Sequence, residues 1–347
     1  MKVLFVGGYG NISWYCTKKA IELGYDVFLL NREQTTKTRR EIPKEAKVIL
    51  ADYRDFERTK NALKNEKFDV VCDFICYNGQ QAQQAVETFR GTTKQYIFIS
   101  SDSVYKTPDA DRLFRETSEK YQLGESSPYI NGKLEAESVF IKAYENEEFP
   151  VTIVRPGYTY DTIMPYSIGH NCFTTVQRCI DGKPLLIAGN GNNKWTFTHS
   201  RDFAQAFVQL FAKEECIGED YQLSGDCVES FNTVMYKILQ LLGVKTYSVI
   251  HIPPEGLLKH EEFSPKDMLH RLQNRVFDNS KIKSIAKGWE TKIGIDEGLK
   301  ETITWMLEKP ERQRFVKTLD DNLENLTKEF YNLKEEINIH GQNLSYL

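Results

Sequence analysis

The chain has 347 residues, of which 40% are hydrophobic and 27% charged, and its formal net charge at pH 7 is −4. This composition is that of a globular protein long enough for two domains, or for one domain with an elaborated lobe. The acidic balance gives no general attraction to nucleic acid or anionic membrane, and no apolar run approaches the roughly 20 residues of a membrane helix.

The cysteines and the first residues bear on the cellular compartment in which the protein works. Seven cysteines, odd in number and scattered, are typical of reduced thiols in a cytoplasmic protein. Met1-Lys2 leads directly into the apolar run 3–6, so we expect no signal peptide. Neither the cysteines nor the six histidines have the spacing of metal ligands, and no metal site is predicted.

The first 30 residues form one recognisable unit. A fully apolar strand over 2–6 runs into the glycine-rich turn 7–13, an amphipathic helix follows to about residue 23, and 26–30 is predicted to be a second strand. A strand, a glycine turn, a helix and a strand in this order are typical of dinucleotide binding. The alternative is a plain glycine turn in an α/β protein.

Within that turn, Gly7 and Gly10 allow the backbone to approach a pyrophosphate closely. The helix begins near Asn11 and Ile12, where free N–H groups and the positive end of the helix dipole favour a phosphate. Ser13 occupies the third glycine position and is small enough for close packing of helix on strand.

The end of the second strand bears on the choice of nicotinamide cofactor. An NAD site usually has an acidic residue there to bind the ribose hydroxyls. This chain has Asn31 and Arg32, with Arg39 and Arg40 further along the same loop. A missing acid with nearby guanidinium groups favours a 2′-phosphate, so we predict NADP rather than NAD, with Arg32 as a solvated loop residue in the alternative case.

Strands and helices keep alternating beyond this unit. Strands are predicted over 47–50, 68–74 and 96–99, with helices to about residue 64 and over 80–89. Strands this apolar belong to a parallel sheet covered on both faces, and ligands bind beyond the carboxyl ends of such strands. The residues at these ends are Gly7, Arg32, Asp52, Tyr77 and Ser101.

Tyr129 and Lys133 stand four residues apart, on one face if the segment is helical. An ammonium beside a phenol lowers the tyrosine pKa from about 10, which makes the phenol a usable proton donor and acceptor. Ser101, at the end of a strand, can hydrogen-bond the same substrate oxygen. Tyr15 and Lys19 have the same spacing, so the pair depends on a cofactor site upstream and a substrate lobe downstream.

Taken in order, these features resemble the extended short-chain dehydrogenase/reductase family of NAD(P)-dependent sugar-nucleotide epimerases, dehydratases and reductases. The matching motifs span about residues 1–307 and are Gly7-x-x-Gly10, Asp52, Ser100-Ser101, Val104-Tyr105, Tyr129-x-x-x-Lys133, Arg155-Pro156-Gly157, Phe197-Thr198-His199, Asp202-Phe203-Ala204, Gly288-Trp289, Gly298-Leu299 and Trp305. The glycine pattern and the strand 94–99 also resemble atypical members, some of which have been linked to RNA binding.

The resemblance implies a Rossmann domain and roles for single residues. Tyr129 would be the catalytic acid/base, Lys133 would lower its pKa and hold the nicotinamide ribose, and Ser101 would orient the substrate oxygen. Besides the turn and the end of the second strand, the implied cofactor contacts are Asp52, Tyr53 and Pro156.

Two positions depart from the family's pattern. Its 4,6-dehydratases carry an acidic pair after the Ser/Thr position, where this chain has Asp102 and Ser103, so dehydration ranks below epimerisation or reduction. Asp102 is otherwise a turn residue. Many epimerases have an arginine four residues before the histidine of the His199 motif to hold the phosphate, and Trp195 stands there, to stack on a ring or simply to pack.

Residues 158–193 are irregular and polar, as expected of a substrate lobe, although a surface insertion would also have this composition. The predicted divisions are a dinucleotide-binding domain over 1–157 whose sheet later strands complete, a mainly substrate-binding lobe over 158–310, and a tail. The predicted substrate contacts are Tyr77, Ser101, Asp102, Tyr158, Asn171, Arg178 and Trp195.

The tail carries an apolar repeat with alternating steps of three and four residues: Val316, Leu319, Leu323, Leu326, Phe330, Leu333 and Ile337. This heptad pattern predicts a C-terminal helix within 311–347. The helix either docks on the body or pairs with a second chain in a homodimer.

The prediction is therefore an α/β protein with a doubly wound parallel sheet, a smaller α/β lobe and a helical tail. Its predicted activity is NAD(P)-dependent epimerisation of a nucleotide sugar through a transient ketone. The alternatives are a reductase or dehydratase of a keto-sugar nucleotide and, from another class, a non-catalytic nucleotide- or RNA-binding relative.

Overall fold

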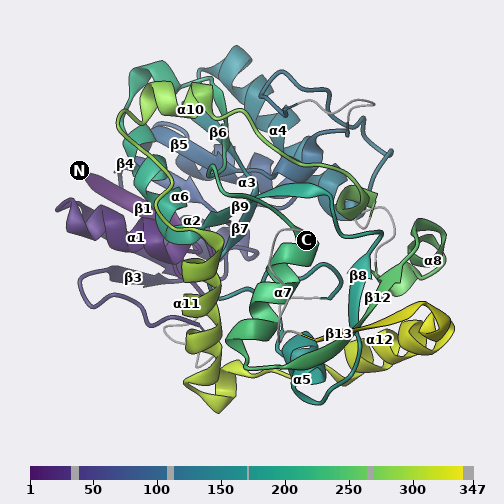
Figure 1. Cartoon of the computed structure of the whole chain (residues 1–347). Helices are drawn as coiled ribbons and strands as arrows, with labels where there is room; N and C mark the ends of the chain where they lie inside the picture. The colour runs from purple at the N-terminus through teal and green to yellow at the C-terminus, as the bar shows by residue number, and fades with distance from the viewer. Residues whose placement is uncertain (33–38, 108–112, 170–171, 264–268, 339–347) are drawn as a thin grey trace.

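The computed structural model describes residues 1–32, 39–107, 113–169, 172–263 and 269–338. Its largest element is a seven-stranded sheet of order β10-β6-β5-β4-β1-β2-β3 in which all neighbours are parallel (Figure 1). The strands are β1 (Lys2–Val6), β2 (Asp26–Asn31), β3 (Lys47–Leu50), β4 (Phe68–Asp73), β5 (Thr93–Ile99), β6 (Val151–Pro156) and β10 (Asp220–Leu223). The predicted doubly wound sheet is confirmed, and β10 completes it from a later part of the chain.

Two layers of helices bury the sheet, because alternate residues of each strand point to opposite faces. Val3 and Phe5 of β1 belong to the apolar core under one layer, and Leu4 and Val6 to the core under the other. The first layer consists of α1 (Ser13–Glu22), α6 (Ser200–Phe207) and α10 (Ser280–Ile285), and the second of α2 (Phe56–Leu63), α3 (Gly79–Phe89) and α4 (Pro128–Glu147). No helix within the described ranges is long and apolar enough to cross a membrane.

The lobe beside this domain contains two three-stranded sheets, β11-β9-β7 and β13-β12-β8 (Figure 1). Their strands are β7 (Tyr158–Tyr160), β8 (Leu185–Ala188), β9 (Lys194–His199), β11 (Val228–Ser230), β12 (Thr246–Ile252) and β13 (Lys334–Asn338). The helices of the lobe are α5 (Thr174–Ile180), α7 (Phe231–Leu241), α8 (Pro254–Leu258) and α11 (Ile295–Leu307). The expectation of irregular structure over 158–193 is thus wrong in part, since β7, α5 and β8 lie there and β8 is a buried strand paired with β12.

The tail begins as predicted and then changes form. Helix α12 (Lys317–Glu329) docks on the body, where Leu319, Leu323 and Leu326 are buried. Beyond α12 the apolar repeat is not helical, because the chain extends into β13 and pairs antiparallel with β12, with Ile337 opposite Tyr247. The apolar face of α12 is therefore covered by this chain and is not free to pair with a second one.

Candidate active site

The glycine turn after β1 is shaped by contacts that a side chain would prevent. Gly7 has a φ of +79°, and a Cβ there would lie 2.6 Å from Cγ2 of Ile75. The Ser13 hydroxyl closes the turn by donating to the Gly7 carbonyl (2.6 Å) and accepting from the Gly10 amide (2.8 Å). The turn leads directly into α1, whose first N–H groups have no partner within the helix. A phosphate can therefore approach this backbone closely.

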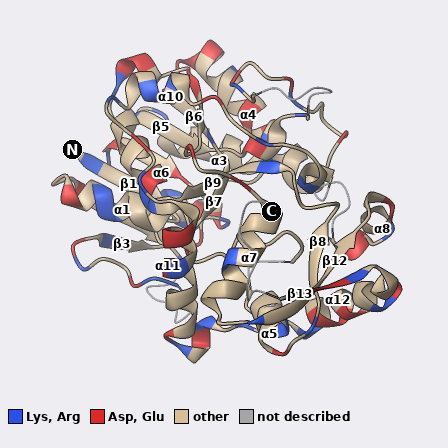
Figure 2. Ribbon diagram, viewed as in Figure 1, with Lys and Arg blue, Asp and Glu red and all other residues tan. Residues whose placement is uncertain are grey.

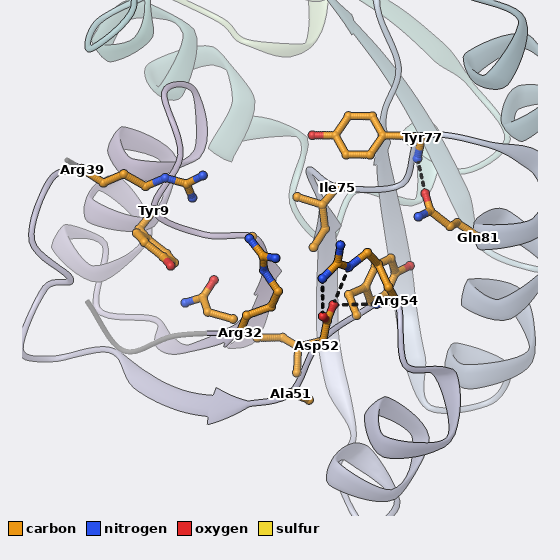
Figure 3. A pocket seen from close by; sticks show the side chains of 13 residues that line it. Tyr9, Arg32, Arg39, Ala51, Asp52, Arg54, Ile75, Tyr77 and Gln81 are labelled. Atoms are coloured by element: carbon orange, nitrogen blue, oxygen red, sulfur yellow. Dashed lines mark hydrogen bonds and ion pairs between the residues drawn. The ribbon is translucent and has the colours of Figure 1, made fainter. Parts of the chain in front are cut away.

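The ends of β2 and β3 form the far side of the same depression. Asn31 is buried, and neither atom of its side-chain amide has a hydrogen-bond partner among the described residues. Asp52 forms an ion pair with Arg54 (2.6 Å), and this hydrogen-bonded guanidinium lowers the pKa of Asp52 to about 2. Arg32 points into the same space (Figure 3). An unpartnered buried amide beside a compensated carboxylate is the environment of a polar ligand.

Asp73, at the end of β4, organises the loop that follows. Its Oδ1 accepts from the amides of Ile75 (2.8 Å) and Cys76 (3.0 Å), and its Oδ2 accepts from the phenols of Tyr53 and Tyr96 (2.5 Å each). Burial raises the pKa of Asp73. The carboxyl group is thus fully used in fixing the loop, and Tyr53 presents its ring rather than its hydroxyl to the depression.

Lys133 lies in the second turn of α4 and is only 2% exposed. Its Nζ donates to the carbonyls of Cys76 (2.7 Å) and Ile99 (2.8 Å), which joins the ends of β4 and β5. Burial lowers the pKa of Lys133 to about 8. Gly132 permits this approach, because a Cβ there would lie 2.3 Å from the carbonyl oxygen of Tyr77.

Tyr129 and Ser101 border the same space as Lys133. Tyr129 is 45% exposed in the first turn of α4, with its ring centroid 6.5 Å from that of Tyr77. The Ser101 hydroxyl accepts from the Ser103 amide (3.2 Å). The structure brings the three predicted catalytic residues to one cleft, and the lowered Tyr129 pKa stays a prediction.

The cleft has two connected parts of about 390 Å³ and 420 Å³. All the predicted cofactor contacts line one part or the other: Gly7, Gly10, Asn11, Ile12, Asn31, Arg32, Asp52, Tyr53, Tyr129, Lys133 and Pro156. The Asn11 side chain itself is turned toward the lobe, where it bonds the backbone of residues 159, 162 and 163. The cleft fits a dinucleotide by its close-approach turn, its unpartnered amide and its two connected parts.

The predicted substrate contacts divide into two groups. Tyr77 and Ser101 line the cleft, although Tyr77 lies over the glycine turn, on the cofactor side. Tyr158 and Trp195 are not among the cleft residues; their rings pack together at 6.0 Å, and the Trp195 indole donates to the Gln273 carbonyl (3.0 Å). Stacking of Trp195 on a ligand is thus replaced by packing in the core.

Asp102 and Arg178 do not contribute a free polar group to the cleft. Asp102 is buried and accepts from Arg275 (3.2 Å), and Arg178 is buried against Asp320 of α12 (2.7 Å). Asn171 lies outside the described residues. Both buried side chains therefore have structural partners that are distant in the sequence.

Sequence reasoning did not select some residues that line the cleft. The sequence could have indicated Arg54, because Arg54 lies two residues after Asp52 and pairs with it. Arg39 is one of the guanidinium groups that favour a 2′-phosphate in the sequence, but it is not among the predicted contacts, and it borders both parts of the cleft. Thr159 and Ile163 enter from the lobe, and no local pattern marks them.

The sequence profile of the NAD dependent epimerase/dehydratase family matches residues 3–224. The chain belongs to this family. The family match confirms the predicted resemblance and makes the protein an NAD-dependent enzyme of the short-chain dehydrogenase/reductase type.

Relatives of the family match most of the chain. The chloroplast stem-loop binding protein of 41 kDa b of Arabidopsis thaliana is 24% identical over 87% of this chain and 78% of its own length. The dTDP-D-glucose 4,6-dehydratase of Mus musculus is 24% identical over 88% of each chain. The UDP-glucose 4-epimerase of Bifidobacterium longum, solved with NAD+ and UDP, superposes with a TM-score of 0.71 at 19% identity, covering 90% of this chain and 100% of that one. At this identity the structural likeness shows the fold alone.

Proposed function

We propose that this protein is an NAD(P)-dependent sugar-nucleotide epimerase that works through a transient ketone, with Tyr129 as acid and base. The observation that carries the proposal is the gathering of Ser101, Tyr129, Lys133 and the glycine turn along one cleft. A nicotinamide bound there would supply a hydride acceptor and donor beside the phenol. The family match supports an enzyme of this class; among the reported relatives and structures, one is a UDP-glucose 4-epimerase and another a dTDP-D-glucose 4,6-dehydratase.

In this proposal the chain's own residues handle the proton and the orientation. Tyr129 takes the proton of a substrate hydroxyl as its carbon becomes a ketone, and returns it when the ketone is reduced on the opposite face. The charge of Lys133 favours the phenolate, and its buried position keeps water from screening that charge. The Ser101 hydroxyl orients the reacting oxygen. Tyr129 is half-exposed, so substrate can reach it.

We propose NADP as the preferred cofactor. Arg32 and Arg54 line the adenosine end of the cleft, and the carboxylate there, Asp52, is paired with Arg54. A compensated acid is a poor acceptor for ribose hydroxyls, whereas an additional guanidinium binds a 2′-phosphate.

Epimerisation fits the residues after Ser101 better than dehydration does. Elimination of water needs one acid for the leaving hydroxyl and one base for the proton on the neighbouring carbon. Asp102 is held by Arg275, with the guanidinium also donating to its carbonyl oxygen (2.6 Å), and Ser103 has no carboxylate. Neither position therefore offers a free acid–base pair.

A nucleotide sugar as substrate is supported by an arginine of the lobe. The Arg271 guanidinium lies over the rings of Tyr158 (4.6 Å) and Trp195 (4.7 Å), and its buried Nη1 has no hydrogen-bond partner among the described residues. Tyr158 directly follows Gly157, which lines the cleft. A diphosphate would supply the missing acceptor for this stacked guanidinium.

The second candidate, an RNA-binding protein without turnover, is favoured by one relative, the stem-loop binding protein. Charge speaks against it: basic and acidic residues intermingle along the ribbon (Figure 2), and the net charge is −4. Binding to RNA needs a basic surface that tracks phosphates.

We also propose that the protein works in the reducing cytoplasm. This rests on its seven cysteines, all of which are free thiols in the structure, six of them buried. Their burial means that oxidation would have to disturb the core.

Incubation of the purified protein with UDP- and dTDP-hexoses in D2O, followed by NMR, tests the function. An epimerase forms the epimer without added reductant and without deuterium at the inverted carbon, because the hydrogen never leaves the site. A dehydratase forms a keto-deoxy sugar carrying solvent deuterium, and a reductase consumes one reduced dinucleotide per turnover. Absence of all three reactions, with binding of stem-loop RNA, would favour the second candidate.

A further inference from the structure

The two parts of the cleft meet at four residues, which line both: Gly7, Ile75, Arg39 and Tyr77. Gly7 and Ile75 lie against each other and form the base of the junction. Arg39 and Tyr77 come from opposite sides, and the Tyr77 hydroxyl points toward the side on which Arg39 lies (Figure 3). The two side chains therefore stand on opposite sides of the junction between the two parts of the cleft.

The position of this junction identifies the part of a ligand that would occupy it. One side of the junction leads to Asp52 and Tyr53, and the other to Tyr129 and Lys133. A dinucleotide lying along the cleft, as the proposed function requires, has its pyrophosphate between its two nucleosides. That pyrophosphate then lies on the glycine turn at Gly7, between Arg39 and Tyr77.

Arg39 has the free charge that such a group needs. Its guanidinium lies 5.1 Å from the centre of the Tyr9 ring, and no carboxylate in the described part of the chain forms an ion pair with it. Four basic side chains line the cleft, Arg32, Arg39, Arg54 and Lys133, against one acidic side chain, Asp52. In a protein of net charge −4, this cleft is suited to a polyanion.

Tyr77 is held so that its hydroxyl reaches the junction. Its backbone amide donates to Oε1 of Gln81 (2.6 Å), and the Lys133 ammonium lies 4.8 Å from the ring centre. Burial raises the pKa of Tyr77 more than the nearby Arg39 lowers it, so the phenol keeps its proton and can donate.

We propose that Arg39 and Tyr77 bind the cofactor pyrophosphate from opposite sides, adding two side-chain contacts to those of the glycine turn. We call this pair the clasp. It makes Tyr77 a cofactor residue instead of the substrate contact predicted from the sequence. It also gives Arg39 a different role from that of Arg32, which lines only the part of the cleft that would hold the adenosine.

Calorimetric titration of the full chain with three ligands tests the clasp. ADP-ribose contains the pyrophosphate, adenosine 2′-monophosphate lacks it but carries the 2′-phosphate, and NADP+ contains both. Arg39→Ala should weaken ADP-ribose and NADP+ about 10- to 100-fold and leave adenosine 2′-monophosphate within about twofold. Tyr77→Phe should weaken ADP-ribose and NADP+ about 2- to 10-fold, since a neutral hydrogen bond is lost.

Arg58→Ala is the matched control, because it removes the same charge from an exposed position of α2 that does not line the cleft. Unchanged binding of ADP-ribose by both Arg39→Ala and Tyr77→Phe would overturn the clasp alone. An equal loss of affinity for adenosine 2′-monophosphate in Arg39→Ala would also overturn the clasp, because Arg39 would then bind the 2′-phosphate. Failure of the wild-type protein to bind any dinucleotide would overturn the proposed function together with the clasp.

Discussion

The arginines of the dinucleotide cleft and those of the lobe differ in what surrounds their charge. Arg32 and Arg39 border an open cleft, and neither forms an ion pair with a carboxylate of the described residues. Arg178 and Arg275 are almost fully buried, and each is paired with a carboxylate, Arg178 with Asp320 and Arg275 with Asp102. An arginine indicates an anionic ligand only where its charge is not already compensated.

The largest expected effect is on stability and concerns a buried arginine. Arg178→Ala leaves Asp320 without its main partner and should lower the free energy of unfolding by about 3–5 kcal/mol, measured by urea denaturation. The affinity for NADP+ should not change, because Arg178 does not line the cleft. Arg178→Lys keeps the charge and serves as the folded control. A tenfold weaker NADP+ affinity in either folded variant would contradict the purely structural role of Arg178.

At the open cleft, Arg32→Ala should lower the affinity for NADP+ without changing the stability of the protein. The affinity for NADP+ should fall about 10- to 100-fold, because a charge-assisted contact to the 2′-phosphate is lost, while NAD+ stays within about twofold. Thermal unfolding should be unchanged, since Arg32 is exposed. A wild-type protein that binds NAD+ more tightly than NADP+ would contradict the proposed preference.

Gly132→Ala tests the packing that places Lys133 below the cleft. The added Cβ would lie 2.3 Å from the Tyr77 carbonyl oxygen, so α4 and the loop must move apart, at about 1–3 kcal/mol of stability. We expect kcat to fall about 100-fold as Lys133 is displaced. Gly294→Ala is the control, because a Cβ there meets no atom within 4 Å. Wild-type activity in Gly132→Ala would show that the Lys133 position is not critical.

The pH dependence of stability reports on the burial of Lys133. Its pKa of about 8 in the folded protein lies below the ordinary value of 10.5, so the unfolded chain binds more protons between these values. Stability therefore rises with pH through this window. The unfolding free energy of the wild type minus that of Lys133→Met should rise by about 1.4 kcal/mol from pH 7 to pH 9. A difference that is constant or falls with pH would contradict a buried ammonium.

The sequence predicted the central sheet closely, because its strands are short apolar runs bounded by glycine or polar residues. The bounds of β1 and β3 agree with the prediction to the residue. The ends of parallel strands then bring Gly7, Asp52 and Ser101 to one cleft without further information.

The lobe could not be predicted in the same way, because its contacts join distant parts of the chain. Asp102 and Arg275 are 173 residues apart, and Arg178 and Asp320 are 142 apart. Similarly, the apolar repeat of the tail continues to Ile337, but the free edge of β12 takes the last segment into a strand. Local patterns do not contain these partners.

The most direct test of the account is to compare Tyr129→Phe with the wild type in turnover and in dinucleotide affinity. Tyr129 touches the reacting end of the proposed cleft, and the variant removes only the hydroxyl. We predict that turnover is lost while the affinity for NADP+ stays within about threefold, since the phenol is needed for proton transfer and not for holding the cofactor. A fully active Tyr129→Phe protein would contradict the proposed chemistry.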